Sequence, residues 1–60
     1  MKLKEIRQQK GFTIAELSKA TGVSRGMITM IENGYKGYKK TTIWKLANAL
    51  EVDAKEIENE

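Results

Sequence analysis

The chain is 60 residues long, so it has room for one domain, residues 1–60, with one small hydrophobic core. It contains neither Cys nor His, which excludes disulfides, leaves a metal site without its usual ligands and leaves no catalytic set visible. We therefore expect no enzyme activity, no metal and no cofactor. The net charge is +3, and the absence of a long apolar run excludes a transmembrane helix, so a cytoplasmic protein without a membrane partner is the default expectation.

The charge is distributed unevenly along the chain. Residues 1–40 carry nine Lys or Arg against three Glu, whereas residues 41–60 carry two Lys against five Asp or Glu. A basic body with an acidic tail suits a polyanionic partner on one side, and solvent or a protein partner on the other. Charge alone leaves a nucleic-acid partner open, because small proteins are often lopsided by chance.

Helical spacing of apolar residues, punctuated by glycines, predicts an all-α chain of five short helices. The first helix is predicted over residues 2–10 and ends at Gly11. The second is predicted over residues 14–20 and opens with a capping box. In this box the Thr13 hydroxyl accepts an amide hydrogen bond, and the Glu16 side chain reaches back.

A tight turn follows the second helix. Gly22 stands where a helix ends in a left-handed residue, Val23 is apolar and fills the corner, and Ser24 is a good N-cap. The third helix is predicted over residues 25–33. Two short helices joined by such a turn, residues 14–33, form a helix-turn-helix, whose second helix enters the major groove of DNA.

A basic, aromatic loop over residues 34–40 separates the third helix from the fourth. Thr41 or Thr42 is expected to cap the fourth helix, which carries apolar residues at helical spacing as far as Leu50. A second capping box, at residues 53–56, opens a short fifth helix. The predicted core consists of Leu3, Ile6, Phe12, Leu17, Val23, Ile28, Ile31, Ile43, Leu46, Leu50, Val52 and Ile57.

Together these motifs resemble the phage-repressor-like helix-turn-helix family, of the Cro/CI or Xre type. The matching segments are Leu3-Lys4-Glu5-Ile6-Arg7, Gly11-Phe12-Thr13, Glu16-Leu17, Gly22-Val23-Ser24, Ile28, Ile31-Glu32-Asn33-Gly34 and Lys45-Leu46-Ala47-Asn48-Ala49-Leu50. The resemblance covers nearly the whole chain and implies a compact five-helix, lambda-repressor-like domain of bacterial or phage origin. It implies a transcriptional repressor that binds double-stranded DNA sequence-specifically, usually as a symmetric dimer on a palindromic operator.

The third helix offers candidates for reading bases. At about 100° per residue, the face opposite the core residue Ile28 carries Gly26, Thr29, Met30 and Asn33. Arg25 flanks this face, and the resemblance assigns base contact to Arg25, Gly26, Thr29 and Met30. Arg25 is the strongest candidate, because a guanidinium can bond guanine O6 and N7 together; its alternatives are a phosphate contact and a solvated charge. Thr29 and Met30 suit contact with thymine methyl groups.

Two residues depart from the family pattern. Ile14 stands where the family usually has a Gln, so it cannot hydrogen-bond a phosphate or a base edge. Gly26 lies early in the recognition helix, where it either allows the backbone to approach DNA closely or is simply tolerated in the first turn. A reading face so poor in polar groups predicts modest specificity or a dependence on DNA shape.

Phosphate contacts are expected from helix N-termini and from the basic loop, because free amides and cations both bind anions. The candidates are Thr13, Ser24, Asn33, Tyr35, Lys36, Tyr38, Lys39, Lys40 and Thr41. The family usually has a Pro at Tyr38 and an apolar residue at Lys40, so this loop is more basic than the pattern. The alternative is a solvated loop that touches nothing.

Further expectations concern packing and self-association. The resemblance implies a structural ion pair between Arg7 and Glu32 that joins the first helix to the third. Trp44 is expected to pack at the edge of the core, with a partner surface as the alternative. The family often dimerises through the fourth and fifth helices. Because the tail over residues 57–60 is acidic with few apolar residues, we predict a weak homodimer that assembles mainly on DNA.

The rival interpretation is a protein-interaction module on the same fold, antitoxin-like or anti-repressor-like, with weak or lost base reading. Ile14, Gly26 and Met30 favour this rival, whereas the basic loop favours DNA. A membrane-surface peptide is excluded, because capping boxes and glycine stops specify a compact globule.

Overall fold

The computed structural model describes residues 2–58, which contain five α-helices and no strand. They are α1 (Lys2–Gln9), α2 (Ile14–Thr21), α3 (Arg25–Glu32), α4 (Lys40–Leu50) and α5 (Ala54–Glu58). The expected all-α, five-helix fold is thus confirmed, and the first three helices end within one residue of their predicted bounds. Asn59 and Glu60, the end of the acidic tail, lie outside the described residues.

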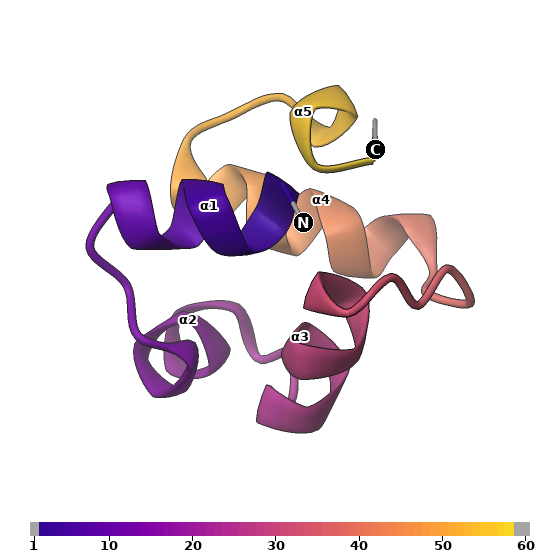
Figure 1. Ribbon diagram of the computed structural model, residues 1–60, viewed down its shortest axis with the longest axis horizontal. Coiled ribbons are helices and arrows are strands. Elements are labelled where there is room, and N and C mark those ends of the chain that lie inside the picture. Colours follow the sequence, from indigo (N-terminus) through magenta and orange to yellow (C-terminus); the bar gives the residue numbers. More distant parts are fainter. Residues whose placement is uncertain (1, 59–60) are drawn as a thin grey trace.

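The helices surround a single core rather than forming layers. In Figure 1, α2 and α3 occupy the lower half of the view, α1 and α4 cross above them, and α5 lies at the top. α2 packs against α3 and α4, α1 packs against α3 and α5, and α4 packs against α5. Each helix is too short to be stable alone, so these contacts hold the fold together.

The core follows the predicted apolar positions closely. Its buried residues are Leu3, Ile6, Leu17, Val23, Ile28, Ile31, Ile43, Leu46, Ala47, Leu50 and Ile57. Phe12 and Val52, both predicted to belong to the core, are only partly buried and pack against its edge. Both stand in connections between helices, where one side of the side chain faces solvent. Ala47 joins the core on the inner face of α4.

The start of α4 differs from the prediction. The helix begins at Lys40 and its N-cap is Lys39, which makes no side-chain cap hydrogen bond. Thr41 and Thr42 therefore lie in the first turn, and neither is the N-cap. A capping side chain contributes only about 1 kcal/mol, so the buried stripe of α4 decides where the helix begins. At its other end α4 stops at Glu51, a non-glycine residue in the left-handed region with φ 59°.

The reach-back bond of the second predicted capping box is present. The Asp53 amide donates a hydrogen bond to the Glu56 carboxylate at 3.2 Å, and the Glu56 amide donates to the Asp53 carbonyl at 3.0 Å. These bonds start α5, whose Ile57 is buried in the core.

Candidate nucleic-acid interface

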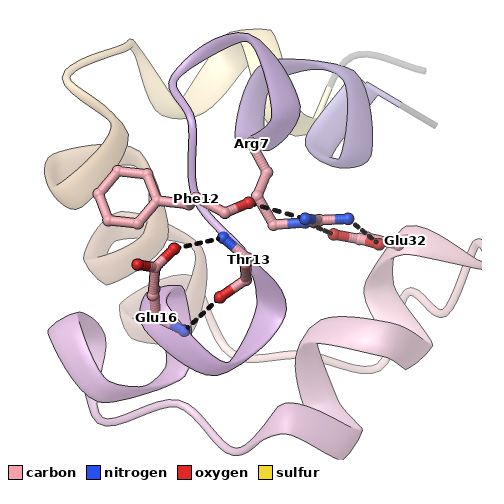
Figure 2. Close-up of polar contacts among 5 residues, drawn as sticks. All are labelled: Arg7, Phe12, Thr13, Glu16 and Glu32. Carbon is pink, nitrogen blue, oxygen red and sulfur yellow. Dashed lines mark hydrogen bonds and ion pairs between the residues drawn. The ribbon is translucent and has the colours of Figure 1, made fainter.

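The first helix of the helix-turn-helix begins with a complete capping box. The Glu16 amide donates to the Thr13 hydroxyl oxygen at 3.0 Å, and the Thr13 amide donates to the Glu16 carboxylate at 2.9 Å (Figure 2). Hydrogen bonds from the backbone and from the side chain of Thr13 lower the pKa of Glu16. The box defines the start of α2 to the residue, with Thr13 exposed at its tip.

The turn between α2 and α3 depends on a glycine and a hydroxyl group. Gly22 takes the left-handed conformation with φ 78°, where a Cβ would be strained. The hydroxyl of Thr21 donates to the Leu17 carbonyl at 2.7 Å and accepts the Val23 amide at 3.1 Å. Sequence reasoning missed this bridge, which holds the chain as Val23 turns into the core.

Both ends of α3 are held by local hydrogen bonds. The Met27 amide donates to the Ser24 hydroxyl oxygen at 3.1 Å, which caps the helix at its start. At its end the Tyr35 amide donates to the Met30 carbonyl at 2.9 Å, so the following loop turns back onto the helix. Asn33 is the C-cap, so α3 ends at Glu32, one residue before its predicted end.

One face of α3 is buried and the other is open. Ile28, Ile31 and Glu32 are buried in the domain. The candidates for base contact all lie on the exposed side, namely Arg25, Gly26, Thr29 and Met30. Met30 is 45% exposed, and a Cβ added at Gly26 would meet nothing within 4 Å. The structure therefore brings these positions together on one accessible face.

A buried ion pair joins α1 to α3. Arg7 Nε donates to Glu32 Oε2 at 2.7 Å, with the two side chains only 9% and 6% exposed. Arg7 Nη1 also donates to the Phe12 carbonyl at 2.8 Å, one residue before the Thr13 cap (Figure 2). Sequence reasoning missed this second bond. Through it a single guanidinium ties α1 both to the start of α2 and to the end of α3.

The candidates for phosphate contact fall into two groups. Thr13 and Ser24 stand at the starts of α2 and α3, and the rest run along the connection that follows α3 and into the first turn of α4. All are exposed except Tyr38, which is partly buried against the core. The side chain of Tyr35 lies over Gly37, so closely that a Cβ added at Gly37 would overlap the Tyr35 ring. The sequence carries no signal for that contact.

Trp44 does not pack at the core edge as expected. It projects from α4 with 57% of its surface exposed, beside an open groove of about 520 Å³. The groove runs between α4 and the start of α5 and is lined in part by Asn48, Val52 and Ala54. Trp44 is therefore a surface residue, and the alternative interpretation, a partner surface, stays a prediction.

Residues 2–58 show neither a metal-ligand cluster nor a membrane span. Nowhere in this range do three or more acidic residues gather as metal ligands would. None of the described helices has the length and apolar character needed to cross a membrane.

Comparison with known proteins identifies relatives over most of the chain. A family model described as Helix-turn-helix matches residues 3–57, which confirms the resemblance that the motifs indicate. The chain is 42% identical over 50 residues to the HTH-type transcriptional regulator SutR of Escherichia coli (strain K12). It is 41% identical over 51 residues to the HTH-type transcriptional repressor RghR of Bacillus subtilis (strain 168). It is 36% identical over 50 residues to the Antitoxin HipB of Escherichia coli (strain K12).

These matches cover 83% of this chain in each case. They cover only 28% of SutR, 38% of RghR and 57% of HipB, so the chain spans well under two thirds of each of these proteins. No solved structure matches the chain at a significant level.

Proposed function

The chain belongs to the helix-turn-helix family, and we propose that it binds specific sequences of double-stranded DNA as a transcriptional repressor, with α3 in the major groove. The observation that carries this proposal is the exposed face of α3. The first residue of α3 is Arg25, an exposed cation that can donate hydrogen bonds. The orientation of α3 is set by the caps at both of its ends and by the buried Arg7–Glu32 pair. A rigidly held helix with an open face is what base reading requires.

Arg25 is the proposed base reader. It is exposed at the start of α3, and the N-terminal residues of recognition helices are the ones that contact base edges. Its guanidinium can bond guanine O6 and N7 together, which discriminates against other bases by about 1–3 kcal/mol. Gly26, Thr29 and Met30 complete the proposed base-contacting face.

Phosphate contacts are proposed on both sides of that face. The Ser24 hydroxyl oxygen accepts the Met27 amide but still carries its own proton to donate. The start of α4 has no side-chain cap, which leaves its positive end for an anion. The remaining proposed contacts are Thr13, Asn33, Tyr35, Lys36, Tyr38, Lys39, Lys40 and Thr41. Cations among them would make binding strongly salt-dependent.

We also propose a weak homodimer that assembles mainly on a palindromic operator in the bacterial cytoplasm. The only strongly apolar side chain of α5, Ile57, is 2% exposed and already used by the core. The described part of α5 therefore has little apolar surface left for a tight dimer interface.

The test is selection of bound duplexes from a random library at two salt concentrations. A recovered palindrome with steeply salt-dependent affinity is the expected result. Arg25→Ala should then weaken the selected duplex by about 1–3 kcal/mol and relax one base position. Replacing Lys39 and Lys40 together by Ala should instead weaken all sequences alike and flatten the salt dependence. Salt-sensitive binding without any sequence preference would contradict gene-specific control.

A protein-interaction module is the second candidate, because the chain is 36% identical to a protein named as an antitoxin. This function becomes the better explanation if no duplex binds even at low salt. Co-purification of the full chain with a defined protein partner would then support it, whereas recovery of an operator would favour DNA reading.

A further inference from the structure

The connection from α3 to α4 is fixed to the domain at both of its ends. At its start Gly34 is left-handed with φ 98°, and its amide donates to the Ile31 carbonyl at 3.0 Å. The next amide, that of Tyr35, donates to the Met30 carbonyl at 2.9 Å. These two bonds form a Schellman motif, which ties the backbone of Tyr35 to the end of α3. At the other end Tyr38 packs against the core.

The middle of this loop is covered by the side chain of Tyr35. A Cβ added at Gly37 would overlap the hydroxyl oxygen and two ring carbons of Tyr35. Within residues 2–58, Lys36 and Gly37 form no hydrogen bond. The ring of a residue tied to α3 therefore holds a stretch of loop that backbone bonds leave unsupported.

The same ring explains why position 37 is a glycine. Gly37 does not lie in the left-handed region, in contrast to Gly34, so its backbone conformation is open to other residues. A glycine in such a place costs stability, because its unfolded chain has more freedom to lose. What glycine provides here is room, since any side chain at position 37 would occupy the place of the Tyr35 ring.

The loop beneath this contact is strongly basic. Lys36, Lys39 and Lys40 carry three positive charges within five residues. No acidic residue lies between Glu32 and Glu51 in the sequence to offset them. Like charges this close repel one another and favour an extended, variable loop. Mobile cations still bind phosphates on any duplex, whereas a specific complex requires them in one arrangement and costs affinity if they must first be ordered.

We propose that Tyr35 and Gly37 form a clasp, with the ring of one on the backbone of the other, that holds the basic loop in its DNA-bound arrangement before DNA is met. The inference rests on the proposed DNA-binding function and adds a determinant of specificity outside the reading face of α3. Gly37 is then a positioning residue, which raises the preference for the operator without contacting a base.

The test measures binding of Gly37→Ala to the duplex recovered by selection and to a random duplex. Alanine keeps every charge and displaces an exposed ring, so the core and the melting temperature of the free protein should change little. Affinity for the selected duplex should fall about tenfold, the factor that ordering one backbone residue on binding accounts for. Affinity for the random duplex and its salt dependence should stay unchanged, because the number of cations is the same.

Variants of Tyr35 assign the effect to the ring. Tyr35→Phe keeps the ring carbons that cover Gly37 and removes only the hydroxyl, so it should retain most of the specific affinity. Tyr35→Ala removes the ring and should weaken the selected duplex at least as much as Gly37→Ala does. The double variant should bind no more weakly than Tyr35→Ala alone, because the two residues act through one contact.

The possible results separate this inference from the function on which it rests. If Gly37→Ala binds the selected duplex as tightly as the parent chain, the clasp does not position the loop and DNA reading stands. Equal losses on the selected and random duplexes would also overturn the inference. If Tyr35→Phe loses as much as Tyr35→Ala, the hydroxyl alone accounts for the effect and the ring has no positioning role. If selection recovers no duplex, the proposed function fails, and the clasp fails with it.

Discussion

The helix-turn-helix and α4 are held in different ways. α2 and α3 each begin at a side-chain cap, Thr13 or Ser24, and the glycine that ends α2 has the conformation that the turn requires. α4 begins at Lys40, its N-cap Lys39 makes no side-chain cap hydrogen bond, and its C-cap Glu51 has an unfavourable left-handed backbone. α4 is positioned instead by its buried stripe, Ile43, Leu46, Ala47 and Leu50.

This difference teaches where the domain needs local definition. A reading helix has to be placed to a fraction of a turn, because a small rotation moves its side chains to other bases. Caps and turns define such placement residue by residue. α4 needs only to cover the core, and apolar packing tolerates ends that are not optimised. The following predictions test this contrast, from the largest expected effect to the smallest.

Arg7→Ala should remove the contacts that tie α1 to the start of α2 and to the end of α3. The substitution leaves the Glu32 carboxylate buried without its cation and removes the bond to the Phe12 carbonyl. Breaking a buried pair costs about 3–5 kcal/mol, which is similar to the whole stability that a small core supplies. Urea titration followed by circular dichroism should therefore find the variant largely unfolded at 25 °C.

A paired substitution serves as the control for this prediction. Arg7→Met combined with Glu32→Leu replaces the pair with apolar groups of similar size, which is often neutral or stabilising. The double variant should recover most of the lost free energy of unfolding. A loss below about 1 kcal/mol for Arg7→Ala alone would mean that the pair behaves like a surface ion pair and does not hold α3.

Thr13→Ala and Thr41→Ala compare a threonine that caps a helix with one that does not. Thr13 accepts the Glu16 amide, so its loss should reduce the free energy of unfolding by about 1 kcal/mol. Thr41 lies in the first turn of α4, where alanine is the better helix former, so its replacement should be neutral or slightly stabilising. Equal losses in urea titrations would place the start of α4 at Thr41 after all.

The same contrast explains how far the sequence predicts the fold. The ends of α1, α2 and α3 follow from local signals, namely Gly11, Thr13, Gly22 and Ser24, and these signals act within one turn. At α4 the two threonines carry the same local signal, but the position of the buried stripe relative to the rest of the core outweighs it. The core packing that decides this point involves residues far apart in the sequence.

The candidate site is predictable to a similar extent. The open face of α3 follows from helical periodicity, whereas the ion pair between Arg7 and Glu32 is predicted by the family resemblance alone. The bond from Arg7 to the Phe12 carbonyl is not predictable, nor is the contact between Tyr35 and Gly37. Both depend on the exact path of a connection, for which neither propensity nor periodicity supplies a rule.

Glu51→Gly should stabilise the end of α4, the helix whose two ends are less well defined than those of α2 and α3. With φ 59°, Glu51 holds a backbone conformation that only glycine adopts without strain, so glycine should raise the free energy of unfolding by about 1 kcal/mol. Thermal and urea unfolding would measure the gain. Glu51→Gln removes the charge but keeps the strain, and it should leave stability nearly unchanged. A gain for glutamine equal to that for glycine would identify charge, not backbone strain, as the cause.

Glu16→Gln tests the bond from the Thr13 amide to the Glu16 carboxylate in the capping box, and its effect should depend on pH. The bonds from Thr13 lower the pKa of Glu16 in the folded chain, so the ionised form favours folding. The contribution is present above the ordinary glutamate pKa of about 4.3 and is lost as pH falls through the lowered value. In urea titrations the variant should therefore be less stable than the parent chain at pH 7, and the difference should shrink in strong acid.

Glu16→Asp separates the two physical causes that could produce this pattern. Aspartate keeps the negative charge near the positive end of α2, but its shorter side chain cannot reach the Thr13 amide as glutamate does at 2.9 Å. If the capping box stabilises α2, aspartate should lose stability at pH 7 as glutamine does. If aspartate matches the parent chain, the charge at the helix end is sufficient, and the reach-back bond is not what defines the start of the helix-turn-helix.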